Sequence, residues 1–143
     1  MLLKRLRLWP VLGVLGPRQV GKSTLLRDLL PQQASGVKYL TLDLKELKSG
    51  ASKAPERFLA ERGHSAKTLV LDEVQKVPEL FDAVKADVDT KRVPGKYILS
   101  GSTEFSAKVG IRESLTGRIG ILRLFPMTVA ELHQRPFVAP WVN

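Results

Sequence analysis

Apolar residues recur along the chain in short runs rich in β-branched side chains, each bounded by turn-forming or polar residues. Such runs predict five β-strands, over Val11–Leu15, Val37–Leu42, Thr68–Leu71, Tyr97–Leu99 and Ile119–Phe125. Between them the apolar residues fall at helical spacing instead. We expect helices over Lys22–Leu30, ended by Pro31, over Pro55–Gly63, and from Pro78 to about Asp89.

Strands that alternate with helices are typical of a parallel sheet covered on both faces. The sequence therefore predicts an α/β fold in one domain. The stretch from Lys48 to Ala54 contains Gly and Ser and is expected to be a surface loop. Near the C-terminus, Thr128 and Glu131 form a capping-box pattern that predicts a short helix, blocked by Pro136.

Composition narrows the class of protein. With 143 residues, of which 43% are hydrophobic and 26% charged, the chain can bury one core, which excludes long disorder and a coiled rod. The sequence has no cysteine, so disulfides and thiolate metal sites are excluded, and we expect a cytoplasmic protein. The formal charge of +9 favours polyanionic partners such as nucleotides, nucleic acid or anionic lipid.

The N-terminus is basic, with Lys4, Arg5 and Arg7 ahead of an apolar run, as in a signal peptide. Pro10 and Gly13 interrupt that run and no small-x-small cleavage site follows, so we reject a signal peptide and expect a solvated basic terminus. No run approaches the roughly 20 apolar residues that span a bilayer.

The segment from Gly16 to Ser23 matches G-x-x-x-x-G-K-[ST], the phosphate-binding loop or Walker A motif. Its glycines let the backbone turn its N–H groups inward around an anion, and the helix that follows directs its positive end at the phosphates. Lys22 is expected to contact the β- and γ-phosphates, and the Ser23 hydroxyl to ligate Mg²⁺.

Two acids end the third predicted strand, as in a Walker B motif. Asp72 is expected to hold the Mg²⁺ shell and Glu73 to orient or deprotonate the attacking water. The alternative for Glu73 is an ordinary solvated helix cap. Together with the phosphate loop, the pair favours a nucleotide hydrolase over a small-molecule kinase.

Further candidates follow the last two strands. Among Ser100, Gly101, Ser102 and Thr103, we choose Ser102 as the hydroxyl near the γ-phosphate or the water, against a simple Ser/Gly turn. Arg118, with Arg112 as substitute, is a candidate to neutralise transition-state charge in this subunit or a neighbouring one, against an ordinary exposed arginine. His64 and His133 are too far apart in the sequence to suggest a metal cluster.

Four segments occur in a characteristic order: GPRQVGKSTLL, LVLDEVQKVPELFDAVKADVD, YILSGSTEF and IRESLTGRIGILRLFPMTVAEL. Over about residues 11–132 the chain resembles prokaryotic AAA-type ATP-binding proteins, in which a P-loop core precedes a C-terminal domain of unknown function. The resemblance implies a three-layer core with a five-stranded parallel sheet of the additional-strand, catalytic-glutamate type. In that sheet the Asp72 strand neighbours the Ser102 strand, which neighbours the phosphate-loop strand.

The family pattern also implies roles. It assigns the phosphate-loop roles to Gly16, Pro17, Arg18, Gln19, Val20, Gly21, Lys22, Ser23 and Thr24, the metal and water roles to Asp72 and Glu73, and the arginine role to Arg118. With the residue-based choices above, the predicted metal ligands are Ser23 and Asp72, and the predicted catalytic residues are Glu73, Arg118 and Ser102. ATP rather than GTP, and Mg²⁺, follow from the resemblance. We expect residues 1–132 to form the ATP-binding domain and residues 133–143 to be a tail truncated before the C-terminal domain.

Two functions stay open. The first is binding and hydrolysis of Mg·ATP by an AAA-type domain, with a homo-oligomer as a compatible assembly. The second is a nucleotide-gated module that binds nucleic acid or protein with little or no turnover, for which the basic charge would supply the surface.

Overall fold

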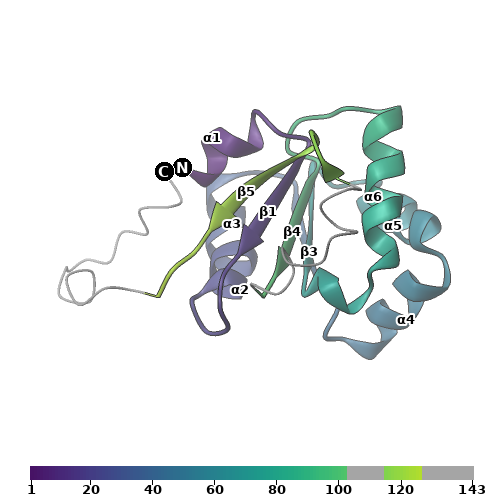
Figure 1. The fold of residues 1–143 in the computed structure, drawn as a ribbon, viewed down its shortest axis with the longest axis horizontal. Coiled ribbons are helices and arrows are strands. Elements are labelled where there is room, and N and C mark those ends of the chain that lie inside the picture. The colour runs from purple at the N-terminus through teal and green to yellow at the C-terminus, as the bar shows by residue number, and fades with distance from the viewer. Residues whose placement is uncertain (103–114, 127–143) are drawn as a thin grey trace.

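The computed structural model describes residues 1–102 and 115–126 (Figure 1). Its helices are α1 (Leu2–Leu6), α2 (Lys22–Thr24), α3 (Leu30–Gln33), α4 (Lys45–Lys53), α5 (Pro55–Gly63) and α6 (Glu79–Thr90). A π-helical turn, η1 (Leu25–Leu29), joins α2 to α3, and a 3-10 turn, η2 (Val74–Lys76), precedes α6. The strands are β1 (Val11–Leu15), β2 (Val37–Thr41), β3 (Thr68–Asp72), β4 (Tyr97–Gly101) and β5 (Ile119–Arg123).

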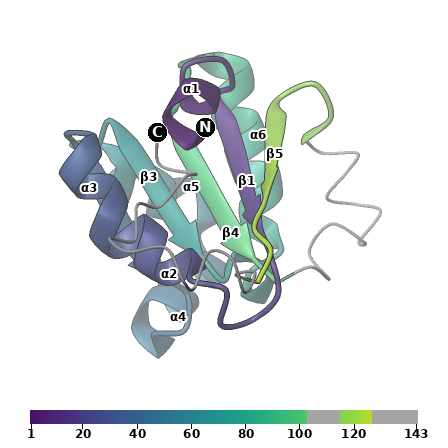
Figure 2. The ribbon, with the colours of Figure 1, turned by 90° about the vertical axis from the view of Figure 1, so that its left-hand side faces the viewer.

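The described strands form one parallel sheet in the order β2-β3-β4-β1-β5. This confirms the predicted α/β fold and the predicted neighbours, since β4 lies between β3 and β1. Helices α1 to α3 cover one face and α4 to α6 the other, as Figures 1 and 2 show from two directions. All strands run the same way, so their carboxyl ends share one edge of the sheet.

The core consists of two apolar layers separated by the sheet. In β1, Val11 and Leu15 belong to the layer under α4 to α6, whereas Leu12 and Val14 belong to the layer under α1 to α3. The same alternation divides β3. Because both faces are covered, the central strands are buried along their whole length, which explains their nearly continuous apolar sequence.

Two predicted elements differ from the structure. The helix expected to stop at Pro31 continues to Gln33, because the π-helical turn shifts the hydrogen-bond register and leaves Pro31 in the first turn of α3. The wider π-helical turn, in which the N–H of Leu30 bonds the carbonyl oxygen of Leu25, directly precedes the proline and lets the helix continue past it.

The prediction of a surface loop from Lys48 to Ala54 was also wrong, because most of this stretch belongs to α4. Ala51 of α4 is fully buried and Leu47 packs against the core, so tertiary burial outweighs the weak helix propensity of Gly and Ser. By contrast, α5 has its predicted bounds.

The helix expected at Thr128 lies outside the described residues. Within the described ranges, no helix is long and apolar enough to cross a membrane.

Candidate functional site

The loop between β1 and α2 lies at the carboxyl edge of the sheet, where its conformation depends on two glycines. Gly16 has no room for a side chain, because a Cβ there would lie 2.7 Å from the carbonyl oxygen of Leu124. Gly21 has φ +91°, in the left-handed region that favours glycine, and Gln19 also has a positive φ of 64°. The loop therefore makes the sharp turn that the motif predicts.

Lys22 begins α2 and is largely buried. Its Nζ donates hydrogen bonds of 2.8 Å to the carbonyl oxygens of Gly16 and Pro17, so the ammonium lies inside the curve of the loop. Burial lowers the pKa of Lys22, and the nearby carboxylates of Glu73 and Asp72 partly oppose that shift. The Lys22 ammonium would bond more strongly to the oxygens of an anion than to these neutral carbonyls, because both partners are then charged. An anion in the loop would therefore replace the carbonyls.

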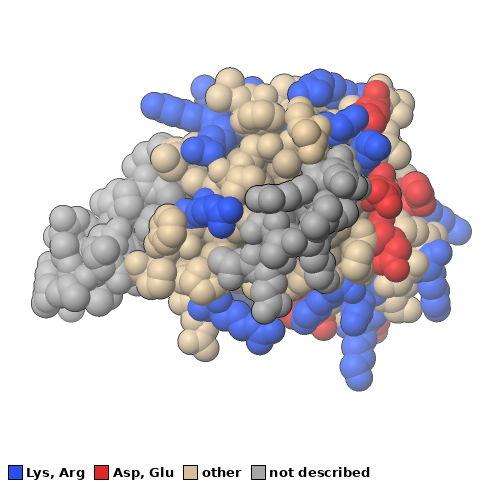
Figure 3. All heavy atoms as spheres, in the orientation of Figure 1, with Lys and Arg blue, Asp and Glu red and all other residues tan. Residues whose placement is uncertain are grey.

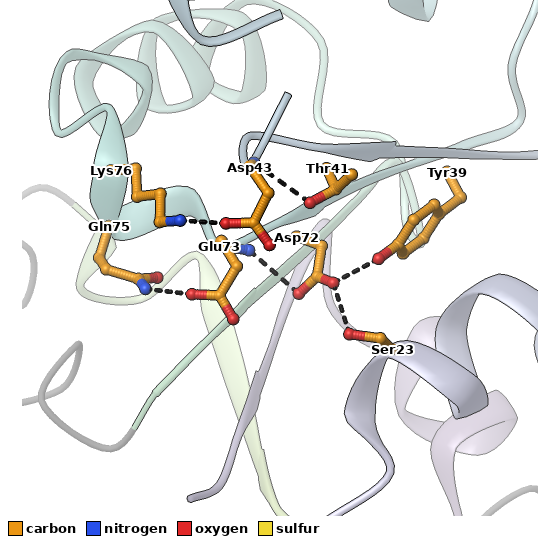
Figure 4. Close-up of polar contacts among 8 residues, drawn as sticks. All are labelled: Ser23, Tyr39, Thr41, Asp43, Asp72, Glu73, Gln75 and Lys76. Carbon is orange, nitrogen blue, oxygen red and sulfur yellow. Dashed lines mark hydrogen bonds and ion pairs between the residues drawn. The ribbon is translucent and has the colours of Figure 1, made fainter. Parts of the chain in front are cut away.

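Asp72, the last residue of β3, connects this strand to the phosphate loop. Its Oδ2 accepts a 2.8 Å hydrogen bond from Ser23 Oγ, a residue 49 positions earlier in the chain (Figure 4). The hydroxyl of Tyr39 donates to the same oxygen, and Oδ1 accepts the backbone N–H of Glu73 at 3.0 Å. The structure thus brings Lys22, Ser23 and Asp72 together, as the sequence predicts.

Glu73 lies immediately after β3 with a left-handed backbone (φ 57°), an unusual conformation for a residue other than glycine. Gln75 donates a side-chain hydrogen bond to Glu73 Oε2 (Figure 4). The Oε1 atom of Gln75 is buried and has no hydrogen-bond partner in the described part of the chain. Glu73 is thus the N-cap residue of η2, as the alternative expected, but its side chain makes no capping hydrogen bond and is held by Gln75 instead.

Ser100, near the end of β4, and Ser102, directly after it, lie at the same edge of the sheet. Leu15 of β1 pairs with Gly101 of β4, so Ser102 follows directly beside the start of the phosphate loop. Ser102 is partly exposed. Ser100 is fully buried, and its Oγ has no partner among the described residues. Thr103 and the substitute candidate Arg112 lie outside those residues.

Arg118 lies at the opposite edge of the sheet. It precedes β5, whose first residue, Ile119, pairs with Val11 at the start of β1. The five-residue strand separates Arg118 from the phosphate loop by roughly 15 Å. Its guanidinium instead pairs with Asp89 of α6, with Nη2 3.1 Å from Oδ2. The structure therefore does not bring Arg118 together with the phosphate loop of its own chain, and its role in catalysis, in this subunit or a neighbouring one, stays a prediction.

The basic N-terminus differs in one residue from the expected solvated segment. Arg5 of α1 is partly buried and donates a hydrogen bond to the carbonyl oxygen of Ile121 in the edge strand β5. His64 is exposed after α5, and His133 lies outside the described residues. Among the described residues, no group of three or more His, Cys, Asp or Glu side chains could hold a metal ion by itself.

Sequence reasoning missed two residues of the site, Tyr39 and Gln75. Tyr39 lies in the middle of β2, where its sequence context is that of any aromatic strand residue. Gln75 follows the acid pair by two positions, and only the backbone turn at Glu73 brings its amide to that carboxylate. The sequence indicated Gln75 only in that it is a polar residue two positions after the acid pair.

The chain is similar to a known protein family over most of its length. The sequence profile of the AAA domain matches residues 9–133, most of the chain. The chain belongs to the AAA-domain family. It is therefore a nucleotide-binding module of the ATPase type, in agreement with the phosphate loop described above.

The chain is also similar to two uncharacterized proteins, one of Mycobacterium bovis and one of Mycobacterium tuberculosis. Each is 32% identical over 123 residues, which cover 86% of this chain and 26% of the relative. The chain thus spans about a quarter of the length of these relatives. Among solved structures, a Rhizobiales Trip13 aligns with a TM-score of 0.47 and 18% identity, over 85% of this chain and 48% of its own.

The pair of Arg118 and Asp89 gives a prediction about pH. The hydrogen bond from Arg118 lowers the pKa of Asp89, so the pair stabilises the fold above the unfolded pKa and stops doing so as pH falls through the folded pKa. We expect Arg118→Ala to raise the pKa of Asp89 toward its ordinary value, as measured by carboxyl-detected NMR titration.

The control for this titration is Arg57→Ala, which removes another exposed ion pair, that with Glu61. It should leave the pKa of Asp89 unchanged. An unchanged Asp89 pKa in Arg118→Ala would show that the pair does not persist in solution.

Proposed function

We propose that this AAA domain binds Mg·ATP and hydrolyses it. The observation that carries the proposal is the 2.8 Å hydrogen bond between Ser23 Oγ and Asp72 Oδ2. It joins the phosphate loop to the strand that ends in the acid pair, with the Lys22 ammonium in the same loop. One bound triphosphate could therefore contact both motifs.

The phosphate loop supplies the binding groups. Lys22 would exchange the carbonyls of Gly16 and Pro17 for oxygens of the β- and γ-phosphates, and the loop N–H groups would surround the rest. The residues proposed for nucleotide binding are Gly16, Pro17, Arg18, Gln19, Val20, Gly21, Lys22, Ser23 and Thr24. The preference for ATP over GTP rests on the family.

The donor set beside the loop fits Mg²⁺. A hydroxyl and a carboxylate are hard oxygen ligands, and Mg²⁺ typically keeps several waters and binds few protein groups together with substrate phosphates. Ser23 and Asp72 would hold the ion, Ser23 through an Oγ lone pair while its O–H still donates to Asp72. When bound, the ion neutralises charge that develops on the phosphates.

Glu73 is the proposed general base. Its carboxylate follows Asp72 directly and is held by Gln75, and it would orient the attacking water and accept its proton. Ser102 would contact the γ-phosphate or that water, and its position directly after β4, beside the start of the phosphate loop, supports this role. Arg118 would act only on the nucleotide of another copy, in a homo-oligomer.

A second function draws on the charge. The net charge of +9, with Lys and Arg side chains spread over the visible face in Figure 3, favours a nucleotide-gated module that binds nucleic acid, with slow or no turnover. ATP binding without phosphate release, together with salt-sensitive association with oligonucleotides, would select this function over ATP hydrolysis.

Replacing the loop lysine tests nucleotide binding. We expect Lys22→Ala to weaken ATP affinity by about two orders of magnitude, because it removes a largely buried cation from the phosphate position. Isothermal titration calorimetry with Mg·ATP measures the change. Lys48→Ala, at an exposed position of α4, is the matched control and should bind like wild type. Equal affinity in wild type and Lys22→Ala would refute the site.

Replacing the base tests turnover separately. We expect Glu73→Gln to keep ATP affinity within about twofold but to slow phosphate release by about 10² to 10⁴, the usual contribution of a general base. The matched control is Glu79→Gln, an exposed carboxylate in the first turn of α6. Hydrolysis at the wild-type rate in Glu73→Gln would remove Glu73 from the mechanism.

A further inference from the structure

Tyr39 contacts the proposed metal site from a strand that carries none of the nucleotide motifs. It lies in β2, next to β3, and is paired in register with Val70. Its ring packs in the apolar layer under α1 to α3, so the body of the side chain is anchored. Its hydroxyl donates to Asp72 Oδ2, beside the hydroxyl of Ser23 (Figure 4).

The hydrogen bonds at Asp72 nearly saturate its carboxylate. An ionised carboxylate offers about four acceptor positions, two on each oxygen. At Oδ2 both are used, by Ser23 and Tyr39, and at Oδ1 one is used by the N–H of Glu73. The carboxylate therefore has one acceptor position left, on Oδ1. That position can accept a hydrogen bond from a water of a hydrated cation.

We propose that Tyr39 is a positioning residue of the cation site, which holds Oδ2 of Asp72 so that Asp72 meets hydrated Mg²⁺ through Oδ1. This inference rests on the proposed Mg·ATP function. Ser23 holds Oδ2 and the backbone N–H of Glu73 holds Oδ1, so one hydrogen bond fixes each oxygen. The Tyr39 hydroxyl, on a ring anchored in the core, adds a second hydrogen bond at Oδ2, which fills that oxygen before nucleotide binds and leaves Oδ1 for the hydrated cation.

The chemistry of Tyr39 suits this role. Its hydroxyl can donate to a carboxylate oxygen, which can only accept, and its ring keeps that hydroxyl in place. A hydroxyl donor to a carboxylate makes a charge-assisted hydrogen bond, which is stronger than a neutral one.

The test separates cation-dependent from cation-independent binding. ATP affinity is measured by calorimetry in EDTA and in saturating Mg²⁺, for wild type and Tyr39→Phe. We expect the gain in affinity that Mg²⁺ provides to fall about tenfold in Tyr39→Phe, the scale of one hydrogen bond to a charged group. Affinity in EDTA should change less than about twofold, because Lys22 and the loop are untouched.

The matched control is Tyr97→Phe. It removes another tyrosine-to-aspartate hydrogen bond, from the Tyr97 hydroxyl to Asp87 Oδ2 at 2.6 Å, in the layer on the other face of the sheet. Thermal unfolding of both variants checks that they fold. Tyr97→Phe should keep the wild-type gain from Mg²⁺. An unchanged gain in Tyr39→Phe, or an equal loss in both variants, would overturn the proposal.

A second measurement uses wild-type protein. The chain has two tyrosines, so ¹³Cζ-tyrosine labelling gives two NMR signals, assigned with the two variants. Adding Mg²⁺ and ATP should shift the Tyr39 signal, because Asp72 then shares its charge with the cation, and should leave that of Tyr97 in place. A Tyr39 signal that stays in place would also overturn the proposal. Wild type that binds no ATP would instead refute the proposed function itself.

Discussion

The hydrogen bond from Ser23 to Asp72 connects the two halves of the site. It ties the first turn after the phosphate loop to the end of a central strand, across 49 residues of sequence. Asp72 is almost fully buried, and a carboxylate in that position needs donors on most of its acceptor positions. Ser23, Tyr39 and the N–H of Glu73 supply them, so the geometry around this one carboxylate is fixed before any ligand binds.

The parallel sheet makes that meeting possible. Since β4 pairs with both β1 and β3, the carboxyl ends of these strands lie within neighbouring distance at one edge. The helices on the two faces bury the strands completely, so the residues that leave the sheet at this edge start from rigid positions. At the other edge, the ion pair of Arg118 with Asp89 joins the segment before β5 to α6.

The sequence was informative where one physical requirement dominates. The phosphate loop was predictable because glycine positions, lysine and hydroxyl must occur at fixed spacing, and the strands because burial on both faces demands continuous apolar runs. It was less informative where tertiary contacts decide. Burial of Ala51 makes a helix of a segment with loop composition, and the π-helical turn accommodates Pro31. The positions of Arg118 and Tyr39 depend on strand register and order, which a single sequence does not specify.

The central claim is that the phosphate loop and the acid pair form one nucleotide site. A crystal structure with Mg²⁺ and a non-hydrolysable ATP analogue tests it most directly. We predict that Lys22 Nζ leaves the carbonyl oxygens of Gly16 and Pro17 for the phosphates, while Ser23 and Asp72 face the same cation. A triphosphate bound away from Asp72, with Lys22 still on those carbonyls, would contradict the account.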